Sequence, residues 1–173
     1  ARAAVLVPLV ERPTGLQVLL TQRASHLKNH PGQISFPGGR IESADAGPWE
    51  AALRETQEEI GLEPQFVTRA GYLQDHLVIS GFRVTPAVGF VQPGFRLRLD
   101  ETEVENVFEV PLEFVLDQRN HLPRDRSIAG HTIVTHEIPT AAAREALRIG
   151  RQGGAWTILN PAPADGLDRS VLS

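Results

Sequence analysis

Residues 54–62 read R-E-T-Q-E-E-I-G-L, and this stretch closes a segment with the pattern of an amphipathic helix. Pro48 begins the segment, at a position where the missing N–H of proline costs little. Gly61 follows the last periodic residue and suits the left-handed backbone that often ends a helix. The sequence therefore predicts a helix over residues 48–60.

On this predicted helix, a narrow apolar stripe that we expect to face the core contains Trp49, Leu53, Thr56 and Ile60. The opposite face carries Glu55, Glu58 and Glu59 at spacings i, i+3 and i+4, so that their carboxylates converge. Three like charges near a helix C-terminus repel each other and oppose the helix macrodipole. A bound Mg²⁺ ion, which prefers oxygen ligands, would relieve this conflict. The alternative interpretation is a solvated acidic face on which Arg54 pairs with Glu58.

The residues before the helix favour the metal hypothesis. Gly38 and Gly39 have no side chains, so their backbone can approach a metal or a phosphate closely. From Gly39 onward the sequence resembles the Nudix box, G-x5-E-x7-R-E-U-x-E-E-x-G-U, where U is typically apolar. Asp45 stands where the box has glutamate, and eight rather than seven residues separate it from Arg54. The resemblance implies the α/β (α+β) class and a Nudix α/β/α sandwich with a mixed β-sheet.

The same resemblance implies roles for individual residues. The ligands of a Mg²⁺ or Mn²⁺ ion would be Glu55, Glu58, Glu59 and the carbonyl of Gly38. Arg54 would position these carboxylates for catalysis. The family takes its general base either from the box or from a later loop, so the candidates here are Glu55 and Glu103. Glu103 alternates with Glu101 and Glu105, which would share one side of an extended chain, and a solvated acidic edge is the alternative interpretation of that trio.

A second stretch lies upstream of the box. Residues 19–39 read L-L-T-Q-R-A-S-H-L-K-N-H-P-G-Q-I-S-F-P-G-G. They resemble the signature L-L-T-x-R-S-x3-R-x3-G-x3-F-P-G-G of the coenzyme A pyrophosphatase branch of the Nudix hydrolases, in which the altered box is also usual. Ala24 replaces serine, and Lys28 replaces arginine, which keeps the charge but loses the bidentate fork. The residues that this resemblance implies in substrate binding are Arg23, Lys28, Gly32 and Phe36.

The branch implies metal-dependent hydrolysis of the diphosphate of coenzyme A or its thioesters, giving 3′,5′-ADP and a 4′-phosphopantetheine product. One alternative is a Nudix pyrophosphatase that acts on another dinucleotide or nucleotide sugar, such as NADH or ADP-ribose. Another is a non-catalytic Nudix ligand sensor, against which the three glutamates of the box argue. Near the end, Gly153-Gly154-Ala155-Trp156 stands where the branch usually has an aromatic segment with Trp-Gly. The sequence leaves open whether the chain forms a homodimer.

The amino-acid composition excludes several other classes of protein and of functional site. The 173 residues, 41% of them hydrophobic, are typical of one folded domain over residues 1–173, with residues 150–173 as a weakly patterned peripheral tail. Without cysteine there is no thiolate metal site and no thiol nucleophile. The net charge of -4 opposes a nucleic-acid partner, and the absence of a long apolar run opposes a membrane partner. We expect a cytoplasmic protein that binds a small-molecule substrate.

Apolar runs and turn residues predict the remaining elements. The expected strands cover residues 3–10 and 16–21, which form a hairpin, and residues 66–73, 77–79 and 82–91. The expected helices cover residues 112–117 and 141–147. Residues 21–39 are expected to form a long functional loop.

Overall fold

The structure is a computed structural model, and it describes residues 1–28, 30–78, 81–128, 131–139, 146–152 and 155–159. The chain divides into two compact units, Ala1–Leu112 and Glu113–Ser173, and each is described by itself. A single domain over residues 1–173, with residues 150–173 as a peripheral tail, stays a prediction.

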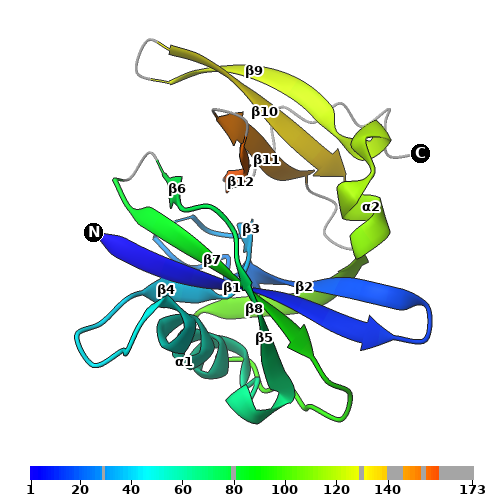
Figure 1. Cartoon of the computed structure of the whole chain (residues 1–173). Coiled ribbons are helices and arrows are strands. Elements are labelled where there is room, and N and C mark those ends of the chain that lie inside the picture. The colour runs from blue at the N-terminus through cyan, green and yellow to red at the C-terminus, as the bar shows by residue number, and fades with distance from the viewer. Residues whose placement is uncertain (29, 79–80, 129–130, 140–145, 153–154, 160–173) are drawn as a thin grey trace. The chain divides into compact units, whose positions relative to one another are not determined.

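Among its described residues, the first unit has an eight-stranded sheet and one long helix (Figure 1). The strands are β1 (Arg2–Arg12), β2 (Gly15–Arg23), β3 (Ile34–Ser35), β4 (Gly38–Arg40), β5 (Val67–Tyr72), β6 (His76–Leu77), β7 (Arg83–Val91) and β8 (Val104–Pro111). The helix is α1 (Pro48–Ile60), and the short 3₁₀ helix η1 (Pro64–Phe66) follows it. The predicted hairpin, the predicted helix over residues 48–60 and the strands predicted over residues 66–73 and 82–91 are confirmed. Of the strand predicted over residues 77–79, Leu77 lies in β6, Val78 does not lie in a strand, and residue 79 is outside the described residues.

The sheet of the first unit is mixed. Its central strand β1 pairs in parallel with β7 on one edge. On the other edge β1 pairs antiparallel with β2 and β4. Antiparallel β5 and β8 extend the sheet beyond β7 and β2, respectively. This mixed α/β sheet with few helices is the fold class that the sequence predicts.

The hairpin of β1 and β2 opens away from its turn. Residues 9–12 pair with residues 15–18 next to the turn. Farther along, β1 pairs instead with β4, where Val5 is opposite Gly38, and the end of β2 pairs with β3. The predicted loop over residues 21–39 therefore contains two short strands that fill the opening. This pairing fixes Gly38 beside the central strand.

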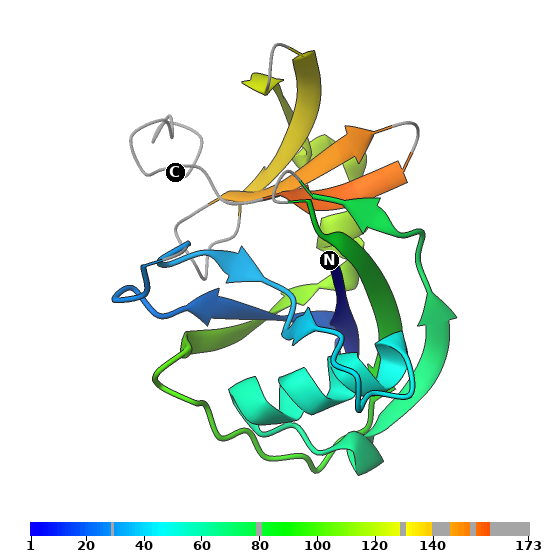
Figure 2. The same cartoon turned by 90° about the vertical axis from the view of Figure 1, so that its left-hand side faces the viewer.

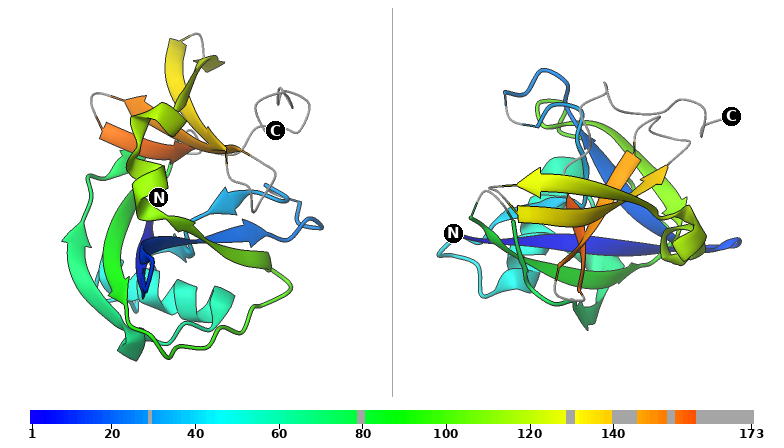
Figure 3. Two further views of the ribbon diagram at one scale, coloured as in Figure 1. Left: turned by 90° about the vertical axis from the view of Figure 1, so that its right-hand side faces the viewer. Right: turned by 90° about the horizontal axis from the view of Figure 1, so that it is seen from above.

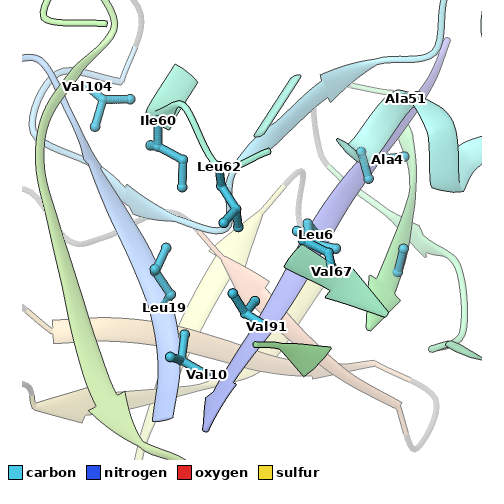
Figure 4. Close-up of a cluster of buried hydrophobic side chains, with 12 residues drawn as sticks. Ala4, Leu6, Val10, Leu19, Ala51, Ile60, Leu62, Val67, Val91 and Val104 are labelled. Atoms are coloured by element: carbon cyan, nitrogen blue, oxygen red, sulfur yellow. The ribbon is translucent and has the colours of Figure 1, made fainter. Parts of the chain in front are cut away.

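Helix α1 lies against one face of the sheet (Figure 2). Its buried residues include Ala51, Ala52, Thr56 and Ile60. Ala51, Ala52 and Ile60 pack in one hydrophobic core with strand residues that include Leu6, Val10, Leu19, Val67 and Val91 (Figure 4). Each fully buried leucine or isoleucine side chain contributes about 1.5–3 kcal/mol. The core therefore holds α1 in a fixed place on the sheet.

The end of α1 is covered by the irregular segment before β8. Gly61 has a left-handed φ of 71°, and its N–H donates to the carbonyl of Gln57 at 2.9 Å. The N–H groups of Arg98 and Asp100 donate at 2.9 Å to the carbonyls of Ile60 and Glu59, which lack partners within the helix. These bonds carry the chain from β7 across the acidic end of α1 toward Glu103.

The second unit contains a separate antiparallel sheet. A short helix, α2 (Leu112–Leu116), connects the units and confirms the helix predicted over residues 112–117. It is followed by η2 (Gln118–Asn120), β9 (Leu122–Ile128), β10 (His131–Pro139), β11 (Ala146–Gln152) and β12 (Ala155–Leu159). The strand order is β12-β11-β10-β9 (Figure 3).

The helix predicted over residues 141–147 is wrong at its last two residues. Ala146 and Leu147 begin β11, where they pair with Pro139 and Ile138 of β10, so tertiary pairing outweighs the helix propensity of alanine and leucine. The rest of that prediction lies outside the described residues. Residues 150–152 and 155–159, which the sequence placed in a tail, lie in β11 and β12.

No helix in the described part of the chain is long and apolar enough to cross a membrane.

Candidate active site

Glu59 is the most deeply buried carboxylate of α1, with 7% of its surface exposed. The N–H of Gly38 donates to its Oε2 at 3.0 Å, so the glycine of β4 holds the carboxylate in place. Burial raises the pKa of Glu59 to about 8, and the negative charges of Glu103 and Glu55 act in the same direction. The Gly38 hydrogen bond and the positive charge of Arg23 only partly oppose this rise.

Glu55 lies one helical turn before Glu59 and against the backbone of β4. A Cβ atom placed on Gly39 would lie only 2.6 Å from Oε1 of Glu55, so only glycine leaves room for this carboxylate. Burial raises the pKa of Glu55, Arg54 opposes the rise, and the charges of Glu58 and Glu103 add to it. The two glycines before the helix thus have separate roles, because Gly38 binds Glu59 and Gly39 makes space for Glu55.

Arg54 connects the start of the box to its end. Its Nε and Nη2 donate to Oδ1 and Oδ2 of Asp45 at 3.0 and 3.1 Å, and Nη2 also donates to the carbonyl of Arg40 at 3.0 Å. Its Nη1 lies 3.1 Å from Oε1 of Glu55 and 3.2 Å from Oε2 of Glu58. The pairing of Arg54 with Glu58, which the acidic-face interpretation expected, is therefore present. The guanidinium also contacts the predicted metal ligand Glu55.

Glu103 reaches the site from a turn and not from a strand. Residues 101–103 form a turn in which the N–H of Glu103 donates to the carbonyl of Asp100 at 2.9 Å, and β8 begins at Val104. The extended conformation assumed for Glu101, Glu103 and Glu105 is therefore wrong for the first two residues. The turn is possible because Asp100 accepts hydrogen bonds from both the N–H and the hydroxyl of Thr102. The charge of Glu103 nevertheless acts on both Glu55 and Glu59.

The four predicted substrate-binding residues lie on or near the ends of β2 and β3. Arg23 is half-buried at the end of β2, and its charge lowers the pKa of Glu59. Gly32 has a left-handed φ of 68°, and its N–H donates to the carbonyl of Arg23 at 3.1 Å. Lys28 is exposed and Phe36 is half-buried, and the binding roles of all four residues stay predictions.

Metal binding fits the chemistry of these side chains. Hard carboxylate oxygens from α1, together with the backbone of Gly38, are the ligands that Mg²⁺ and Mn²⁺ accept. Burial is the largest cause of the raised pKa values of Glu55 and Glu59, so the ionised form of each carboxylate is disfavoured in the metal-free protein. A divalent cation at this position would stabilise the ionised forms.

The carboxylates are not gathered into a ready metal cage. Within the described ranges of the chain, no three His, Cys, Asp or Glu side chains are placed to hold a metal ion together. The reason is visible in the contacts, because Glu58 pairs with Arg54 while Glu59 accepts from Gly38. Glu58 has 61% of its side chain exposed. The ligand set of Glu55, Glu58, Glu59 and the Gly38 carbonyl stays a prediction.

Sequence reasoning named two residues, Asp45 and Glu105, without predicting the contacts that the structure gives them in this region. Asp45 has a side chain only 5% exposed and is the bidentate partner of Arg54. Asp45 lies before α1, so helical spacing could not predict its pairing with Arg54. Its position in the Nudix box was the sequence signal that could have indicated a role. Oε2 of Glu105 accepts the N–H of Ser25 at 3.1 Å, a contact between residues 80 positions apart that no local pattern reveals.

The fold and this cluster of acidic side chains define a mixed α/β protein with a helix-borne carboxylate site. A family model for the NUDIX domain matches residues 1–130, and the chain belongs to the Nudix family. Nudix hydrolases generally use divalent metal ions. The Nudix family, which the sequence predicted from residues 39–62, is thereby confirmed. Membership of the coenzyme A pyrophosphatase branch stays a prediction.

Curated relatives agree with the family assignment. The "Uncharacterized Nudix hydrolase NudL" of Salmonella paratyphi B is 49% identical over 125 residues, which is 72% of this chain and 64% of the relative. The protein of the same name from Salmonella newport gives the same values. The chain thus spans 64% of the length of these curated relatives.

Solved structures show the same fold. The Nudix hydrolase RenU from M. smegmatis has a TM-score of 0.56 and 24% identity, over 66% of this chain and 73% of that chain. The C. elegans Ap4A hydrolase in a binary complex has a TM-score of 0.55 and 22% identity, over 64% of this chain and 80% of that chain.

Proposed function

We propose that the protein is a metal-dependent pyrophosphatase that hydrolyses the diphosphate of coenzyme A or its thioesters to 3′,5′-ADP and a 4′-phosphopantetheine product. The substrate is inferred from residues 19–39, which resemble the coenzyme A signature. The hydrolase activity is inferred from the family and from the names of the relatives.

One structural observation supports the reaction most directly. Glu55 and Glu59 of α1 and Glu103 of the turn before β8 influence one another electrostatically beside the backbone of Gly38 and Gly39. A divalent cation bound there would neutralise the diphosphate charge and make water a better nucleophile. Three acidic groups beside a glycine backbone therefore offer both a cation site and a proton acceptor.

The side chains then divide the work of hydrolysis. A carboxylate oxygen of Glu55 or Glu103 accepts a proton as a water oxygen bonds to one phosphorus. The bridging oxygen leaves with the other phosphate, which completes the cleavage of the diphosphate. Arg54, held by Asp45, keeps Glu55 in place. Arg23 is suited to bind a phosphate oxygen at the edge of the site, because guanidinium groups bind phosphates in a bidentate manner.

The test is chromatographic analysis of products after incubation of the protein with coenzyme A and Mg²⁺ or Mn²⁺. We expect 3′,5′-ADP and 4′-phosphopantetheine to appear in equal amounts, and neither to appear with Glu59→Gln. Cleavage of NADH or ADP-ribose without cleavage of coenzyme A would replace this substrate by the first alternative. Binding of coenzyme A without turnover of any of these compounds would instead identify a ligand sensor.

A further inference from the structure

A loop between β2 and β3 carries two of the predicted substrate-binding residues, Lys28 and Gly32. We call residues 24–28 and 30–33 the recognition loop. Its two ends meet at Arg23, whose N–H donates to the carbonyl of Gln33 at 2.8 Å and whose carbonyl accepts from Gly32 at 3.1 Å. These bonds hold the two ends of the recognition loop together. Its position relative to Glu55, Glu59 and Glu103 depends on other contacts.

The other contacts come from the chain around the start of β8. The N–H of Ala24 donates to the carbonyl of Glu103 at 2.9 Å, and the N–H of Ser25 donates to Oε2 of Glu105 at 3.1 Å. The pairing of β2 with β8 is irregular between Gln22 and Arg23, immediately before these two residues. At this irregularity the recognition loop leaves the sheet, and the two bonds attach it to the segment that carries Glu103.

We propose that Glu105 is a positioning residue that holds the recognition loop in its substrate-binding conformation. The inference rests on the proposed function, because it assumes that Lys28 and Gly32 contact the substrate. A carboxylate that accepts a backbone N–H forms a charge-assisted hydrogen bond, which is stronger than a neutral one. This bond acts on the first turn of the recognition loop, where the N–H of Leu27 donates to the carbonyl of Ala24 at 3.3 Å.

This role differs from that of Glu103, its neighbour in the acidic trio. The charge of Glu103 acts on Glu55 and Glu59, and Glu103 is a candidate general base of the proposed reaction. The side chain of Glu105 is engaged with the backbone of Ser25. Loss of Glu105 should therefore weaken binding of the substrate, whereas loss of Glu103 should slow the chemical step.

The experiment compares Glu105→Ala and Glu105→Gln with Glu101→Ala, which removes an exposed carboxylate from the turn before β8. In Glu105→Ala we expect KM for coenzyme A to rise about fivefold while kcat changes less than about twofold, as for loss of one charge-assisted hydrogen bond. Glu105→Gln, which keeps an oxygen acceptor, should recover part of the loss. Glu101→Ala should leave KM unchanged.

A second measurement tests the role of Glu105 without any assay of enzymatic activity. Amide hydrogen exchange at Ser25 should become faster in Glu105→Ala than in the wild type and in Glu101→Ala, while amides within β8 keep their protection. Equal exchange at Ser25 in all three proteins, or a KM unaffected by Glu105→Ala, would overturn the inference. Failure of the wild type to cleave coenzyme A would overturn the proposed function, and the exchange at Ser25 would still decide whether Glu105 holds the recognition loop.

Discussion

The guanidinium of Arg54 meets the carboxylate of Asp45 along two parallel hydrogen bonds, from Nε to Oδ1 at 3.0 Å and from Nη2 to Oδ2 at 3.1 Å. The pair leaves only Nη1 for the acidic residues of α1, at 3.1 Å from Glu55 and 3.2 Å from Glu58. The Arg54 guanidinium holds the pKa of Asp45 below its usual range, so Asp45 stays ionised as the partner of Arg54. Asp45 thereby limits how strongly Arg54 competes with a divalent cation for the two glutamates.

We predict that Asp45→Asn weakens metal binding. Without its bidentate partner, Arg54 is expected to pair more fully with Glu55 and Glu58, which a cation must then displace. The dissociation constant for Mn²⁺, measured by calorimetry, should rise about tenfold, which corresponds to ~1.4 kcal/mol. Asp45→Glu, which restores the carboxylate, should recover part of this loss. Equal affinity in Asp45→Asn and the wild type would show that Arg54 does not compete with the metal.

Glu55→Gln and Glu59→Gln should each lower kcat by about two orders of magnitude or more, because each removes a charge at the cation site with little change in volume. Both variants should unfold cooperatively, since neither leaves a cavity. The matched control is Glu50→Gln, which neutralises an exposed carboxylate in the first turn of the same helix. If both site variants turned over substrate as fast as this control, the site assignment would be wrong.

Gly39→Ala should reduce activity more than stability. The new methyl group would overlap the Glu55 carboxylate, which can move aside only by leaving its position at the site. We expect a fall in kcat of about tenfold or more, with a change in Tm of only a few degrees. In the control Gly47→Ala, the added methyl group would lie 3.3 Å from the exposed carboxylate of Glu50, which is not part of the site, so kcat should be retained.

The sequence predicted α1 well because its determinants are local. Pro48 and Gly61 mark the two ends of the helix, and the apolar stripe between them follows one period. The hairpin of β1 and β2 was equally accessible, since two apolar runs flank a turn. The motif also identified the acidic residues of α1, whose chemistry depends on residue type and spacing.

The features that the sequence did not reveal depend on contacts between distant segments. Glu59 was placed on a face opposite the core, yet it is buried, because Gly38 approaches it from β4. The turn that carries Glu103 is fixed by Asp100, whose N–H binds the carbonyl of Glu59 across 41 positions of sequence. Helical periodicity contains no information about either contact.

The burial of Glu59 predicts an unusual dependence of stability on pH in the metal-free protein. In the unfolded chain its carboxyl titrates near the ordinary value of 4.5, whereas in the folded state its pKa is about 8. Between these values the folded state binds more protons than the unfolded state. The contribution of this group to stability therefore falls as pH rises from about 5 to 8, by at most ~1.4 kcal/mol per pH unit. Below pH 4.5 the carboxyl is protonated in both states, so the free-energy cost of burying its charge is absent. Above about pH 8 it is ionised in both states, and this cost is constant.

Glu59→Gln separates this effect from all other titrating groups. Measured without divalent cations, the difference in Tm between Glu59→Gln and the wild type should be small at pH 5 and should favour the variant increasingly up to pH 8. Mg²⁺ stabilises the ionised carboxylate, so it should raise the Tm of the wild type more at pH 8 than at pH 6, and it should have little effect on the variant. A difference in Tm that does not change between pH 5 and 8 would contradict the raised pKa. In that case burial would not disfavour the ionised form of Glu59, and a divalent cation would not be needed to stabilise it.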